Sequence, residues 1–209
     1  MDAFDVAATL LSRANGNRLS ALKLQKLTFY SFGWFAHLTG ERLFKENFFA
    51  LPKGPIVSEL YSAHSGQDHV TLEGLQDNLQ RSLQVQEDYA AEVIDAVFET
   101  YGRYNQYDLV EMTHLEQPWR QAWHAPGRRG KSAPLPSDHI VDFFLKKSDT
   151  RYALPDRTVE VGIKAQLPSR RFTQVSWSGL QVMMHQPMEV PESLGERAAA
   201  ARRRLRISA

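Results

Sequence analysis

The chain has 209 residues, of which 43% are hydrophobic and 23% charged, and its formal net charge is +1. This length allows one ample core, or a core with a small appendage, and the composition is that of a globular protein. The chain has no cysteine, which excludes disulfides and thiolate metal sites, and no apolar run reaches the ~18 residues that a membrane span needs.

The ends of the chain differ in charge. Residues 1–166 hold 18 Lys or Arg and 21 Asp or Glu, whereas residues 167–209 hold seven Arg and three Glu. A mildly acidic body is therefore followed by a basic tail. The N-terminal acids Asp2 and Asp5, with no basic region before an apolar run, argue against a signal peptide, so we expect a cytoplasmic protein without a membrane partner.

Hydrophobic spacing predicts a series of helices along the first 150 residues. The longest apolar-rich stretch, 22–38, should be a central helix between an N-cap at Ser20 and a stop at Gly40, because apolar side chains cover most of its circumference. The clearest helical periodicity lies in residues 87–104. The other predicted helices cover residues 2–14, a short stretch from Pro55 through Leu60 and Tyr61, 105–115, a segment starting at Pro118, and a segment capped by Ser137.

Little of this region is predicted to be β-structure. Residues 48–51 can form a short strand before a turn from Pro52 to Pro55, and residues 62–72 and 125–136 are expected to be loops. The predicted fold is therefore mainly α, with residues 1–150 forming a compact domain of about six to seven helices and one short β element.

Residues 151–209 are expected to form a separate extension. Residues 158–163 alternate polar and apolar side chains, and residues 172–177 are rich in β-prone types, so together they predict a β-hairpin-like unit. Residues 185–193 resemble a linker, and residues 194–206 a short basic helix.

Signatures of catalysis are sparse. Gly130, Lys131 and Ser132 match the last positions of a phosphate-binding loop, but Ala125 stands where the motif needs its first glycine. Neither the loop histidines His64 and His69 nor His37 matches a metal signature with a defined ligand count, so we expect no metal and no cofactor.

His114 is the best candidate for acid–base chemistry. It follows Thr113 and lies near Glu116 and Trp119, which is compatible with a hydrolase, but no nucleophile stands at a recognisable spacing. A hydrogen-bonded structural role is the simpler interpretation, and chemistry alone favours a protein that is not an enzyme.

The C-terminal arginines leave three interpretations open. Arg202, Arg203 and Arg204 can contact phosphates of a nucleic acid, pair with an acidic protein partner, or form a solvated tail. No basic recognition helix of a helix-turn-helix is apparent, which weighs against a DNA-binding regulator of its own operon.

Three motifs occur in a fixed order along residues 5–147. The first is Leu22-Lys23-Leu24-Gln25-Lys26-Leu27 followed by Tyr30, and the second is Gly54-Pro55-Ile56-Val57 with Leu60-Tyr61. The third is Leu109 with Thr113-His114 and Pro118-Trp119. Together they resemble the Panacea domain, also called SocA-like and formerly GepA-like, of phage-associated and bacterial antitoxins. The family often has a Trp shortly before the Gly-Pro turn, where this chain has Phe48 and Phe49.

The resemblance implies an antitoxin that neutralises a cognate toxin by direct protein contact. An adaptor that delivers the toxin to a cytoplasmic protease is the alternative within the family. The motif residues are then expected to hold the fold rather than contact the toxin. They are Leu24, Lys26, Leu27, Tyr30, Gly54, Pro55, Tyr61, Thr113, His114, Pro118 and Trp119.

Two other sets of side chains are candidates for partner contact. The extension carries residue types that are enriched at interfaces, namely Arg171, Phe172, Trp177, Met183 and Met184. Phe29 and Phe32 fall off the main apolar stripe of the 22–38 helix, so they would meet a partner if the folded chain left them exposed.

Overall fold

The computed structural model describes residues 1–79, 88–128, 130–148, 150–161 and 163. The chain divides into two compact units, Met1–Phe172 and Thr173–Ala209, and the described residues all belong to the first. The helices are α1 (Ala3–Arg13), η1 (Asn15–Asn17), α2 (Ala21–Thr39), α3 (Ser58–Ala63), η2 (Glu73–Asn78), α4 (Asp88–Tyr101), α5 (Gln106–Leu115), α6 (Gln117–Trp123) and α7 (Ser137–Lys146). The strands are β1 (Arg18–Ser20), β2 (Phe48–Leu51), β3 (Gly54–Val57), β4 (His69–Thr71), β5 (Ala133–Leu135), β6 (Arg151–Ala153) and β7 (Thr158–Glu160).

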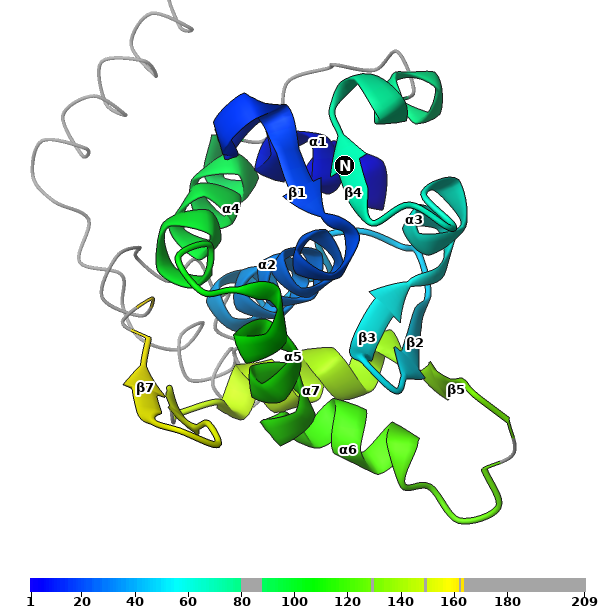
Figure 1. Cartoon of the computed structure of the whole chain (residues 1–209). Coiled ribbons are helices and arrows are strands. Elements are labelled where there is room, and N and C mark those ends of the chain that lie inside the picture. The colour runs from blue at the N-terminus through cyan, green and yellow to red at the C-terminus, as the bar shows by residue number, and fades with distance from the viewer. Residues whose placement is uncertain (80–87, 129, 149, 162, 164–209) are drawn as a thin grey trace, which may run out of the picture. The chain divides into compact units, whose positions relative to one another are not determined.

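Helix α2 lies at the centre, with α1, α4, α5, α7 and β3 packed around it (Figure 1). Almost all of its side chains from Leu24 onwards are buried, in agreement with a helix that is apolar on nearly every side. Trp34, Tyr30, Phe29 and Phe32 are among the largest fully buried side chains of the described residues. The predicted central helix is therefore confirmed.

The predicted helix ends agree with the structure at several points. Ser20 accepts a hydrogen bond from the backbone N–H of Lys23, and Gly40 ends α2 in the left-handed conformation with φ +82°. Asn105 caps α5 by accepting from two backbone N–H groups. Ser137 was expected to cap α7 but is its first residue, and Pro136 occupies the cap position without a side-chain hydrogen bond.

Three small sheets accompany the helices. β1 pairs with β4, β6 pairs with β7, and the third sheet has the order β3-β2-β5, with all pairs antiparallel. Pro55 and Pro134 lie in the two edge strands of the third sheet, opposite Ala50 and Phe49 of β2. An edge strand tolerates proline because one side of its backbone needs no ladder hydrogen bond.

The prediction of a mainly α fold is wrong, because the described residues hold seven strands in three sheets and form a mixed α/β fold. The number of helices agrees with the prediction. β2 confirms the short strand expected at residues 48–51, but β1, β3, β4, β5 and β6 were not predicted, because three or four residues are too few to show an alternating pattern. Pro55 lies in β3 rather than at a helix start, and β4 and β5 lie in segments that were expected to be loops.

Residues beyond 150 contribute to the first unit. Of the segment 158–163, which was predicted to join residues 172–177 in a hairpin-like unit, residues 158–160 form β7, and β7 pairs with β6. Residues 172–177, the second predicted strand, lie outside the described residues. Tyr152, Leu154, Val161 and Ile163 are buried in the same core as α2.

No helix among the described residues combines the length and the apolar character needed to cross a bilayer.

Candidate functional site

The first two sequence motifs meet at Lys26. Its side chain is fully buried, and its Nζ donates a hydrogen bond of 2.7 Å to the carbonyl oxygen of Pro55 in β3. Burial penalises the charged form and lowers the pKa of Lys26 to about 7. This contact fastens the edge strand β3 to the N-terminal half of the central helix.

Gly54 lets the three motifs approach one another. Its φ is +93°, and a Cβ at this position would lie 2.6 Å from Oγ1 of Thr113 and 2.9 Å from Cε of Lys26. The Thr113 hydroxyl in turn donates to the carbonyl oxygen of Val110 at 2.8 Å. Only glycine combines this backbone conformation with such close neighbours.

The third motif builds a column of stacked rings. The ring of His114 stacks on Trp119 with centroids 3.9 Å apart, and Trp119 stacks on Trp123 at 5.7 Å. The guanidinium of Arg128 lies 3.8 Å from the centroid of the Trp123 ring and ends the column. The indole N–H of Trp119 donates to the carbonyl oxygen of Leu51 at 3.0 Å, which fixes the column to β2.

His114 is held as a neutral ring. Burial lowers the pKa of His114, and the nearby positive charge of Lys26 lowers it further. Glu111 and a hydrogen bond with the Pro52 backbone raise the pKa, but the net shift is downward. The hydroxyl of the adjacent Thr113 is engaged by the Val110 carbonyl. This arrangement suits a packing role, since the ring stacks on Trp119 instead of facing a nucleophile.

A second buried polar cluster surrounds Glu116, which precedes α6. Its Oε1 accepts from the Tyr152 hydroxyl at 2.7 Å, and its Oε2 lies 3.0 Å from Nζ of Lys147. The Tyr152 and Tyr101 hydroxyls are 3.2 Å apart, and the Trp34 indole N–H donates to Tyr101 at 3.0 Å. Burial raises the pKa of the Glu116 carboxyl. This chain of polar groups links α2 and α4 to β6.

Sequence reasoning did not single out Glu116 as a buried group. An acidic residue just before Gln117 and Pro118 is typical of an exposed helix start, where it favours the helix dipole. Tyr30 adds to the cluster by stacking on Tyr101 with ring centroids 4.1 Å apart. No sequence signal links Glu116 to Tyr152, because the partners lie 36 positions apart.

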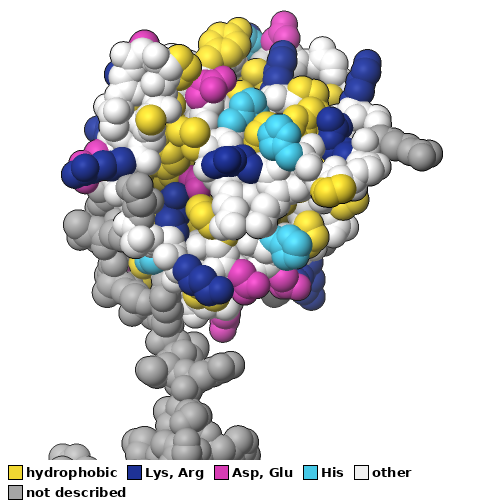
Figure 2. All heavy atoms as spheres, turned by 90° about the horizontal axis from the view of Figure 1, so that it is seen from below, with side chains coloured by type: hydrophobic (Ala, Val, Ile, Leu, Met, Phe, Trp, Pro, Cys, Tyr) yellow, Lys and Arg dark blue, Asp and Glu magenta, His cyan; other side chains and the backbone are white. Residues whose placement is uncertain are grey.

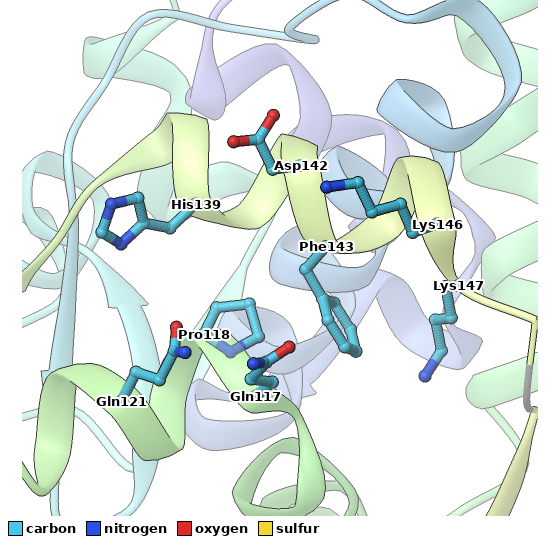
Figure 3. A pocket seen from close by; sticks show the side chains of 8 residues that line it. All are labelled: Gln117, Pro118, Gln121, His139, Asp142, Phe143, Lys146 and Lys147. Carbon is cyan, nitrogen blue, oxygen red and sulfur yellow. The ribbon is translucent and has the colours of Figure 1, made fainter.

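A groove runs between α6 and α7. It is lined by Gln117, Pro118, Gln121, His139, Asp142, Phe143, Lys146 and Lys147. In Figure 3, Phe143 points from α7 toward Pro118 and Gln117 on α6. The base of the groove is thus partly apolar, and polar or charged side chains stand along its edges.

No group of three or more His, Asp or Glu side chains in the described part of the chain is placed to hold a metal ion. The loop residue His64 is buried, and its Nε2 lies 3.0 Å from Nε2 of Gln25. Gln25 also accepts from the backbone N–H of Val57 at 2.8 Å, so this polar pair ties α2 to the end of β3.

In a comparison with known families, residues 24–120 match the family described as "Antitoxin SocA-like, Panacea domain". This segment is therefore similar to the SocA-like Panacea domain, and it is called the Panacea domain below. No curated protein and no solved structure matches the chain.

Most motif residues of the Panacea domain lie inside it. Lys26, Gly54, Pro55, Thr113 and Trp119 form the contacts described above. Leu24, Leu27, Tyr30 and Pro118 are also buried. His114 is partly exposed at the end of its column. Tyr61 differs from the others, because 43% of it is exposed on α3.

The suggestion that Phe29 and Phe32 could meet a partner needs correction. Both are completely buried, and both rings contact Phe48 of β2, with centroids 6.0 Å and 5.0 Å away. They lie off the main stripe but are buried, because β2 and α7 cover that side of α2. The folded Panacea domain therefore does not present them to a partner.

The other predicted contact residues lie outside the described residues. These are Arg171, Phe172, Trp177, Met183, Met184, Arg202, Arg203 and Arg204.

Proposed function

We propose that this protein is the antitoxin of a toxin–antitoxin pair and neutralises its toxin by direct protein contact. The observation that carries the proposal is the Panacea match over residues 24–120, whose description names an antitoxin. An antitoxin needs a toxin as its partner. Neutralisation by direct binding requires only a surface that contacts the toxin, whereas an adaptor must also bind a protease.

The positions of the motif residues support a binding role. The side chains of Lys26 and Thr113 donate hydrogen bonds to backbone carbonyl groups inside the domain, and both lie close to Gly54. Such contacts stabilise a scaffold and leave recognition to the residues on its surface. We further propose that the protein is not an enzyme, since His114 stacks on Trp119 at 3.9 Å as a packing residue does.

Co-expression with the product of the adjacent gene tests the proposal. The full chain should restore growth to cells that produce this gene product, and the two proteins should purify together. His114→Phe keeps a ring for stacking on Trp119 but removes the imidazole, and it should restore growth as well as the natural chain. Loss of rescue in a well-folded His114→Phe variant would support acid–base chemistry instead.

The same experiment separates neutralisation from delivery to a protease. Under the proposal, rescue persists in cells that lack their cytoplasmic proteases, and the amount of the gene product is unchanged. Rescue that depends on a protease, with disappearance of the gene product, would support the adaptor alternative. Absence of both rescue and co-purification would contradict the proposed function.

A further inference from the structure

Helix α6 presents one face outward. Gln117, Arg120, Gln121 and His124 are all exposed and recur at the spacing of a single helix face. The opposite side of the helix is fixed, because Pro118 and Trp119 are buried. This short helix thus carries an exposed polar face opposite a buried side.

This face continues into a basic segment. Residues 117–137 contain four Lys or Arg and no Asp or Glu. Among the described residues no carboxylate forms an ion pair with Arg120, Arg128 or Lys131. Figure 2 shows lysine, arginine and histidine side chains, together with several acidic ones, interspersed with apolar side chains over the lower face of the molecule, where α6 lies.

Arg128 is held in place on this face. Its guanidinium lies 3.8 Å from the Trp123 ring centroid, and its Nη1 donates to the carbonyl oxygen of Gly130 at 2.6 Å. A side chain that is already ordered loses less entropy on binding, and Trp and Arg are the residue types that dominate binding energies at interfaces. The groove beside α6, with Pro118 and Phe143 in it, offers apolar contact next to these charges.

We propose that the toxin binds this protein through an acidic patch on the toxin's own surface. The patch would contact the α6 surface, which we define as Gln117, Arg120, Gln121, His124 and Arg128. This inference rests on the proposed function and names the surface that carries it out. An acidic protein complements unpaired arginines beside an apolar groove. A nucleic acid fits less well, because residues 1–166 as a whole hold more acidic than basic side chains and would repel its phosphates.

Charge reversal tests the docking surface. The affinity of the full chain for the adjacent gene product is measured for Arg120→Glu, for Arg128→Glu and for a control, Arg18→Glu. Arg18 is also exposed, but it lies on β1 at the opposite end of the unit in Figure 1. Each α6-surface variant should bind about tenfold more weakly, mainly through slower association, whereas the control should stay within about twofold of the natural chain. Unfolding midpoints that match the natural chain show that the variants are folded, and Arg120→Glu leaves the Trp123–Arg128 stack intact.

Several results would overturn the inference. Unchanged affinity of both α6-surface variants, or an equal loss in Arg18→Glu, would show that the toxin docks elsewhere. Unchanged toxin binding together with lost binding of a labelled DNA duplex would assign the surface to nucleic acid. Unchanged toxin binding together with a change from dimer to monomer would assign it to a second copy. If the natural chain itself fails to bind the gene product, the proposed function is contradicted rather than the choice of surface alone.

Discussion

The Nζ of Lys26 donates a 2.7 Å hydrogen bond to the carbonyl oxygen of Pro55, which joins the central helix to an edge strand 29 positions further along the chain. An ammonium group so deeply buried is expensive to keep charged. Lys26 belongs to the first motif and contacts Pro55 of the second. The two motifs together therefore determine how β3 packs on α2.

This burial predicts a characteristic pH dependence of stability. The pKa of Lys26 is about 7 in the folded chain, below its ordinary value of 10.5. Between these values the unfolded chain binds more protons than the folded chain, so the contribution of Lys26 to stability rises with pH. The free energy of unfolding of the natural chain, minus that of Lys26→Met, should increase by about 1 kcal/mol per pH unit above about pH 7. Urea unfolding of both chains at stepwise higher pH checks this, and a constant or falling difference would show that the ammonium is solvated.

Gly54→Ala should destabilise the chain strongly. The new methyl group would meet Oγ1 of Thr113 at 2.6 Å in a backbone conformation with φ +93°. We expect a loss of about 2–4 kcal/mol from strain and overpacking together. Gly40→Ala is the matched control, because Gly40 also has positive φ, at +82°, but a Cβ added there would meet nothing within 4 Å. It should cost only about 1–2 kcal/mol, and equal losses in the two variants would contradict the close approach of the motifs.

Tyr152→Phe should weaken the link between β6 and the Panacea domain. The variant removes the 2.7 Å hydrogen bond to Glu116 and the 3.2 Å contact with the Tyr101 hydroxyl, and it leaves a buried carboxylate with less compensation. We expect a loss of about 1–3 kcal/mol in the free energy of unfolding. Tyr107→Phe serves as the control, since Tyr107 is 67% exposed and should change stability by less than about 0.5 kcal/mol. Similar effects of the two variants would argue against the buried network.

The helices could be predicted from the sequence because their signals are local. Ser20, Asn105 and Gly40 act on backbone groups within one turn, and the apolar periodicity of 87–104 needs no knowledge of its partners. Strands such as β5 could not be predicted, because Pro134 is typical of a loop until β2 is known to lie beside it. A three-residue strand is determined by its neighbour rather than by its own pattern.

The candidate site shows the same division. The resemblance to the Panacea family grouped the motif residues before their positions were known, and the match over residues 24–120 agrees with it. Their mutual contacts required the fold, as did the role of Glu116, whose partners Lys147 and Tyr152 lie beyond the matched segment. The burial of Phe29 and Phe32 likewise depends on β2 and α7, which cover a side of α2 that its own sequence leaves undefined.

Direct neutralisation is tested most sharply by titration of the purified toxin with the purified full-length chain. We predict that toxin activity falls in proportion to added chain and reaches zero at a fixed molar ratio, without a protease or any other component. Toxin activity that persists in excess chain, or that is abolished by an amount of chain far below the amount of toxin, would contradict neutralisation by direct protein contact.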